Sequence, residues 1–92
     1  MSLLVMAIAN QLADDACGPA WGSQLRKDTK RGRIARAARS AAASALIRHL
    51  GDVEPGAWHY AAPGFEERLK AARSVASAAF EAEVEYLRSH GA

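Results

Sequence analysis

The chain has little of what would brace it covalently or anchor it in a membrane. It contains one cysteine, Cys17, so an intrachain disulfide is excluded and a secreted, disulfide-stabilised scaffold is not indicated. No apolar run approaches the ~20 residues that a transmembrane helix requires. The apolar start, residues 3–9, lacks the preceding Lys or Arg of a signal peptide. We therefore expect a soluble, cytoplasmic protein with no membrane partner.

Catalytic signatures and metal-ligand spacings are also missing. The 3 histidines lack the close pairing of a zinc site, which argues against a bound metal. The best candidate for a catalytic site combines one nucleophile with three proton-transfer groups: Cys17, His49, His59 and Tyr60. Their spacing in the sequence does not show that these side chains meet in the fold. Cys17 is better explained as a small buried hydrophobe at the end of a helix. We expect no enzyme activity and no cofactor.

Alanine is what the chain has in abundance. Hydrophobic residues make up 50% of the 92 residues, but alanine dominates them and the larger apolar side chains number only about two dozen. A single domain over residues 1–92 buries roughly 60 to 65% of the surface of its unfolded chain. Its core is therefore thin. Association with a second copy would add burial, so we expect a homo-oligomer.

Apolar residues recur at helical spacing in three segments, which predicts helices over about 3–16, 23–50 and 63–90. In the first helix, residues at the i, i+3, i+4 and i+7 positions share one face: Val5, Ile8, Ala9, Leu12, Ala13 and Ala16. The third helix has a similar stripe: Phe65, Leu69, Ala72, Ala76, Ala79, Phe80 and Leu87. The sequence therefore predicts an all-α fold.

Turn residues and caps set the helix boundaries. Gly51 is expected to end the second helix, and Pro63 suits the first residue of the third. The start of the second helix is open, because Ser23 and Thr29 are both suitable N-caps and Gly32 weakens a helix by about 1 kcal/mol relative to alanine. We favour a start near residue 23, with a shorter helix from about 29 as the alternative.

The three helices predict a small bundle in which helices 2 and 3 form an antiparallel hairpin and helix 1 packs across them. The second helix has two semi-apolar faces, as expected of a central helix with neighbours on both sides. Glu83 falls at the centre of the apolar stripe of the third helix. In an antiparallel hairpin Arg36 or Arg33 would meet it, so we predict a structural ion pair between Arg36 and Glu83.

Aromatic residues gather where the helices are expected to be interrupted. Trp21 follows a Gly-Pro break, and the linker over residues 51–62 carries Trp58, His59 and Tyr60. Aromatic side chains on loops are favoured interface anchors, so these four residues are the candidate partner-binding site. The alternative is that the rings cap the ends of a bundle short of bulky residues.

Positive charge is concentrated in the middle of the chain. Residues 26–48 hold eight Lys or Arg and one Asp, a net charge of +7, whereas residues from 51 onward hold four basic and seven acidic residues, a net charge of −3. Exposed cations at this density can bind phosphates. The candidate nucleic-acid-binding residues are Arg26, Lys27, Lys30, Arg31 and Arg33. The alternative is that their long stems cover alanine-rich surface as ordinary packing.

The function expected from these features is that of a noncatalytic helical interaction protein, an adaptor, inhibitor or assembly component. It would bind another macromolecule through its helix faces and the aromatic loop at residues 58–60. The alternative is a nucleic-acid-binding regulator that uses the basic segment at residues 26–39.

Overall fold

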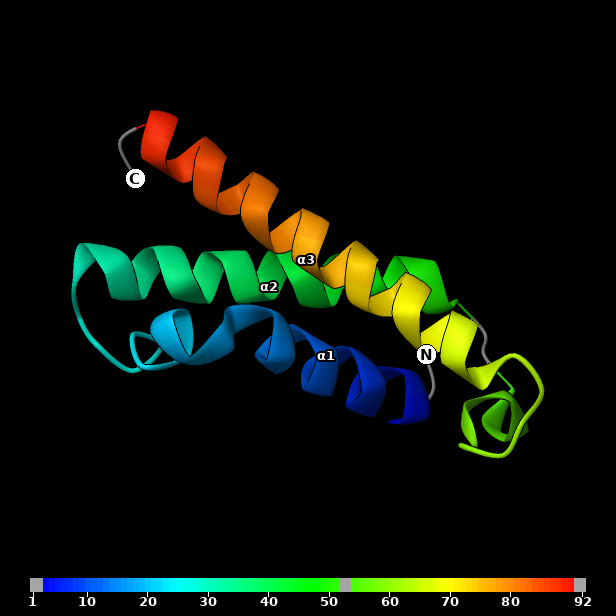
Figure 1. Ribbon diagram of the computed structural model, residues 1–92. Helices are drawn as coiled ribbons and strands as arrows, with labels where there is room; N and C mark the ends of the chain where they lie inside the picture. Colours follow the sequence, from blue (N-terminus) through cyan, green and yellow to red (C-terminus); the bar gives the residue numbers. More distant parts are fainter. Residues whose placement is uncertain (1–2, 52–53, 91–92) are drawn as a thin grey trace.

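The chain folds into three helices and one short helical turn, shown in Figure 1 as a computed structural model. The structure describes residues 3–51 and 54–90. In chain order the elements are α1 (Leu3–Gly22), α2 (Lys30–Leu50), the 3₁₀ turn η1 (Pro55–Trp58) and α3 (Phe65–Ser89). No strand occurs in this part of the chain. The predicted all-α three-helix bundle is therefore confirmed.

Helix α2 lies between α1 and α3 and packs along both, while α1 and α3 contact each other less (Figure 1). Alanine makes this possible, because its small side chain lets neighbouring helices approach closely. The buried residues of α2 are Gly32, Ile34, Ala35, Ala38, Ala42, Leu46 and Leu50. The expected role of this helix as the centre of the bundle is confirmed. Within the described residues no helix is both long and apolar enough to cross a bilayer.

Helix α1 runs to Gly22, but the predicted Gly-Pro break interrupts it: Gly18 leaves the helical conformation, and two helical segments meet there at a kink. Gly18 has φ 64° and ψ −179°, a left-handed conformation that glycine adopts without steric cost. Pro19 then starts a further helical turn, since its fixed φ suits the first position of a helix. Trp21 therefore lies in the last turn of α1, and the prediction that it sits in a loop was wrong.

Helix α2 begins at Lys30, so the favoured start near residue 23 was wrong and the shorter alternative is confirmed. The side chain of Thr29 caps it: its Oγ1 accepts a hydrogen bond from the amide of Gly32 at 3.0 Å. The connection before Thr29 folds back over this first turn. A Cβ on Gly32 would overlap the carbonyl oxygen of Lys27, so only glycine fits.

The other helix ends follow from two glycines. Gly51 ends α2 as predicted, with φ 57° and a hydrogen bond from its amide to the Ile47 carbonyl at 3.1 Å. Gly64, with φ 74°, is the N-cap of α3. The third helix therefore begins at Phe65 and not at Pro63. The helix ends at Ser89, within one residue of the predicted end. The sequence also suggests Gly91 as its terminator, and that residue lies outside the described residues.

Candidate functional site

A hollow of about 310 Å³ lies between α1 and the beginning of α3. It exists because both helices pack on α2 and touch each other less, which leaves large side chains covered on one side only. We call it the α1–α3 groove. Its lining is mostly apolar: Ala7, Ile8, Gln11, Leu12, Trp58, Phe65 and Leu69.

Trp58 closes one end of the α1–α3 groove from the η1 turn. Its indole meets the Phe65 ring edge-on, with 6.1 Å between ring centroids and 82° between planes. Arg68 holds the turn against α3, since its guanidinium donates to the carbonyls of Ala57, at 3.0 and 2.6 Å, and Pro63, at 2.8 Å. The indole N–H of Trp58 is buried and has no acceptor among the residues that the structure describes. Such an orphaned donor costs on the order of 1 to 3 kcal/mol.

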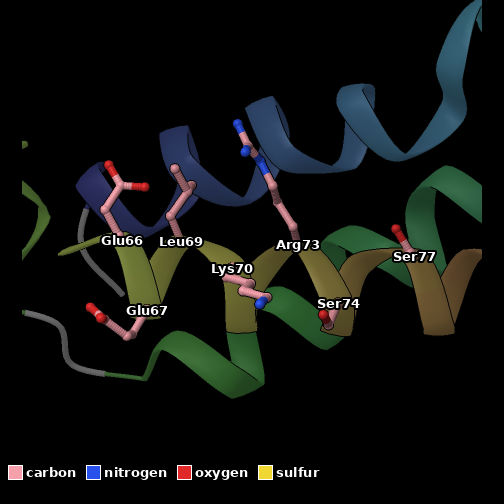
Figure 2. A pocket seen from close by; sticks show the side chains of 7 residues that line it. All are labelled: Glu66, Glu67, Leu69, Lys70, Arg73, Ser74 and Ser77. Carbon is pink, nitrogen blue, oxygen red and sulfur yellow. The ribbon is translucent and has the colours of Figure 1, made fainter. Parts of the chain in front are cut away.

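The surface of the groove continues onto the outer side of α3, shown in Figure 2. Two acidic residues, Glu66 and Glu67, lie in the first turn of α3, and Lys70 and Arg73 follow one and two turns later. The side chain of Arg73 extends toward α1, and it lines a second hollow with residues of that helix: Leu12, Asp15 and Ala16. None of these four charged α3 residues forms an ion pair within the described chain.

The start of α1 also presents large apolar side chains to solvent. Leu3 is 85% exposed and Met6 is 43% exposed. Leu3 stands one turn before Ala7, which lines the groove, so the apolar surface extends from the groove toward the first turn of α1. Contiguous apolar surface of this kind marks interaction sites in monomeric proteins.

The four predicted partner-binding residues are not brought together. Trp58 lines the groove, while Trp21 lies at the far end of α1. There the Trp21 ring is covered by Phe80, edge-on at 6.2 Å, and by the guanidinium carbons of Arg31 and Arg88 at 5.0 and 5.5 Å from its centroid. Groups from α2 and α3 thus hold Trp21 of α1 as a cap of the bundle.

His59 and Tyr60 follow Trp58 but are not among the residues that line the groove. Their rings stack at 4.5 Å and 29°, and Tyr60 is 80% exposed. His59 is oriented by its own backbone, since the amide of Ala61 donates to its Nδ1 at 3.1 Å. The pair therefore forms a fixed, exposed aromatic surface next to the η1 turn.

The predicted nucleic-acid-binding residues are all exposed and lie close together in the chain, in the connection before α2 and in its first turn. Arg36 organises this connection, because its Nη1 donates to the carbonyls of Leu25 at 3.0 Å and Lys27 at 2.9 Å. Arg33 approaches Asp28 at 3.9 Å, and both side chains are largely in solvent. The first turn of α2 contains no acidic residue.

The predicted ion pair between Arg36 and Glu83 is absent. The guanidinium of Arg36 is engaged by the two carbonyls of the connection, and the half-buried Glu83 forms no ion pair within the described chain. The folded-back connection before α2 presents backbone carbonyls to the helix face that carries Arg36, and these take the place of the predicted carboxylate. The ion pair that joins two helices is Arg39 with Asp14, at 2.6 Å, and no sequence pattern pointed to it.

Cys17 lies near that ion pair and is buried in the core. Its Sγ donates to the Ala13 carbonyl at 3.4 Å, and burial raises the pKa of its thiol. The hydrogen bond that Arg39 donates to Asp14 raises the pKa of its guanidinium. The interpretation of Cys17 as a small buried hydrophobe is confirmed.

Among the four candidate catalytic residues, Cys17 lies apart from His49. The guanidinium of Arg39 acts electrostatically on Cys17, and His49 lies ten residues further along α2, or about 15 Å at the helical rise. His59 and Tyr60 are stacked on each other beyond the end of that helix. The described residues also contain no group of three or more His, Cys, Asp or Glu side chains placed to hold a metal ion.

Comparisons with known proteins add no relative: no family model, no curated protein and no solved structure matches this chain.

Proposed function

We propose that this chain is a noncatalytic helical interaction protein whose docking surface is the α1–α3 groove. The observation that carries the proposal is the placement of the large apolar side chains. Seven of the 15 buried hydrophobic residues are alanine, while the larger Ile8, Leu69 and Trp58 stand half-buried in an open hollow. Large apolar groups in a hollow are typical anchors of protein interfaces. The lone, buried Cys17 suits a reducing compartment, so the proposal places the protein in the cytoplasm.

A helix is the partner element that best suits the groove. Helices α1 and α3 both pack on α2 and leave a hollow between them, and a fourth helix laid there would complete a four-helix arrangement. Its apolar residues would contact Ile8, Leu12 and Leu69. Tyr60 adds exposed aromatic area beside the η1 turn, as expected for the rim of such an interface.

Photo-crosslinking in cells tests the groove even when the identity of the partner is open. A photoreactive amino acid replaces Gln11, an exposed residue of the groove, and in a matched variant it replaces Ser44, an exposed residue of α2. We expect a discrete crosslinked product from position 11 and none from position 44. Equal labelling at both positions, or none at either, would contradict the proposal.

A second candidate function is nucleic-acid binding by the basic segment. It is favoured by the unusual charge of the first turn of α2, where acidic residues are normally preferred. Lys30, Arg31 and Arg33 occupy its first turn with no acidic residue among them. Each cation there is opposed by the helix macrodipole, by about 0.3 to 1 kcal/mol. Phosphates at this end would reverse the sign of that interaction.

Titration of labelled duplex DNA and single-stranded RNA tests the second candidate at about 50 and 200 mM salt. Lys30→Glu should lower affinity for every sequence and reduce the salt slope by about 1 to 2. Arg48→Glu, at the other exposed end of the same helix, is the matched control and should change little. Absence of binding at the lower salt concentration removes this candidate. Arg31 is left intact because its guanidinium lies over Trp21.

A further inference from the structure

We infer, on the basis of the proposed docking role of the α1–α3 groove, that its occupant is a second copy of this chain. The two copies would be related by a twofold axis that passes between Leu69 and Lys70 of α3. Each copy would place Glu66 opposite the partner's Arg73. The groove of one copy would then be covered by the same face of the other.

The charges on the outer side of α3 are self-complementary in this arrangement. In an antiparallel helix pair across a twofold axis, residues equally distant from the axis in opposite directions face each other. Glu66 and Arg73 are seven residues apart, about 10 Å along the helix, with the axis at their midpoint. Lys70 then lies within one turn of the partner's Glu66.

The same charges exclude the parallel arrangement, which would set Glu66 against the partner's Glu66 and Arg73 against the partner's Arg73. They are also free to pair between copies. Glu66 and Lys70 have the i, i+4 spacing that commonly pairs within a helix, yet the described chain contains no ion pair for either residue. Both are exposed, as is Arg73.

Apolar surface surrounds the position of the proposed axis. Leu69 lies next to it on α3, and it shares the groove with Ile8 and Leu12 of α1. The exposed Leu3, one turn before Ala7, extends this surface along α1. A stable dimer needs about 800 Å² from each copy, which is about one-seventh of the 5826 Å² that this chain exposes. The area of a face built from two adjacent helices, α1 and α3, is of that order.

The alternative occupants are a helix of a different protein and a nucleic acid. A strand of phosphates would be repelled by Glu66 and Glu67 and gains nothing from the apolar lining. Binding to a different protein would not require opposite charges at equal distances on either side of one point of α3. The second copy is the occupant that uses both the apolar lining and the charge order.

Sedimentation velocity of the purified chain over a wide concentration range tests the inference. We expect a reversible monomer–dimer equilibrium. Glu66→Arg should weaken the dimer about ten- to hundredfold, since it creates two like-charge contacts in each dimer. The double variant Glu66→Arg/Arg73→Glu restores both pairs with reversed sign and should return the dissociation constant to within about threefold of the original.

Because the substituted residues are exposed, the variants are expected to fold like the original chain. Circular dichroism of each variant verifies that they do. Glu81→Arg is the matched control on an exposed site of α3 away from the groove, and it should leave the dimer unchanged. A chain that stays monomeric, or a dimer indifferent to Glu66→Arg, overturns the inference. The groove itself is judged separately: a crosslink from position 11 to another protein, with a monomeric chain, keeps the proposed docking function and removes only the second copy.

Discussion

The two tryptophans lie toward opposite ends of the bundle, and their surroundings differ. Trp21 meets Phe80 edge-on and has the guanidinium groups of Arg31 and Arg88 over its ring, so α2 and α3 both contribute to its cover. Trp58 meets the Phe65 ring edge-on, but its N–H is buried without an acceptor and it lines an open groove. We call these the closed end and the open end.

The difference shows how a chain with an alanine-rich interior distributes its few large side chains. At the closed end, aromatic rings and arginine stems cover one another and complete the core. At the open end, large apolar side chains remain half-exposed and a polar group remains unsatisfied. Natural sequences break local rules of this kind mainly where a function requires it. The open end is therefore the functional candidate, and variants at the two ends should behave differently.

The largest expected contrast comes from truncating one phenylalanine at each end. Phe80 is 3% exposed, so Phe80→Ala should lower the free energy of unfolding by about 3 to 5 kcal/mol. Phe65 is half-exposed in the groove, and Phe65→Ala should cost about 1 to 2 kcal/mol, because less area leaves water on folding. Urea unfolding followed by circular dichroism measures both. Equal losses would mean that the open end is as tightly packed as the closed end.

The second contrast uses two glycines near the closed end. Alanine normally stabilises a helix relative to glycine, but Gly32→Ala should lower the free energy of unfolding by about 1 to 3 kcal/mol, because its Cβ would strike the Lys27 carbonyl. Gly22→Ala is the matched control, since nothing lies within 4 Å of its added Cβ. It should change stability by less than about 0.5 kcal/mol. A neutral Gly32→Ala would show that the connection before α2 is free to move away.

Helical periodicity was sufficient to predict the helices and the central place of α2, because the alanine and leucine spacing encodes faces directly. Periodicity could not predict which backbone groups of the connection before α2 fold back onto that helix. From the sequence, Gly32 was expected only to weaken a helix. The structure shows why a glycine is required there: the carbonyl of Lys27, five residues earlier, occupies the space that a Cβ would need. Arg36 looked like a partner for Glu83, while carbonyls of the same connection hold it.

The groove was beyond sequence reasoning for a related reason. Periodicity shows which face of each helix is apolar, but not how far two helices that share a neighbour stand apart from each other. Leu3 and Leu4 do not both fit the apolar stripe that contains Val5. This misfit is the signal in the sequence for a second apolar surface on the first helix. Arg39 and Asp14 are 25 residues apart, and no local rule pairs them.

The third contrast replaces each tryptophan by phenylalanine. Trp21→Phe should lower the free energy of unfolding by about 1 kcal/mol, since the smaller ring contacts less of Phe80 and attracts Arg31 and Arg88 more weakly. Trp58→Phe also loses ring area, but it removes the unsatisfied N–H, so the net change should be close to zero. Thermal unfolding of the two variants, side by side, measures the difference. A larger loss for Trp58→Phe would show that its N–H has found an acceptor.

The smallest contrast is a pH dependence at Cys17, one turn before Trp21 on α1. Burial raises the pKa of this thiol in the folded chain, whereas the unfolded chain titrates near the ordinary value of about 8.5. Stability is therefore full below that pH and falls as pH rises toward the folded pKa, because only the unfolded chain releases the proton. The loss at about pH 9 is at most about 0.8 kcal/mol.

Cys17→Ala lacks the thiol, so the fall in stability between about pH 7 and 9 should be smaller in this variant than in the original chain. Urea unfolding of both chains at both pH values measures how much the pH-dependent loss of stability differs between them. The cost of the cavity left by the variant is the same at both pH values and therefore cancels.

A second cysteine sharpens the comparison of the two ends. In the Cys17→Ala background, Ile8→Cys places a thiol in the groove, where it should react with iodoacetamide much faster than Cys17 does in the original chain, because the thiolate forms where water reaches it. Equal reaction rates would mean that water reaches the closed end as readily as the open one.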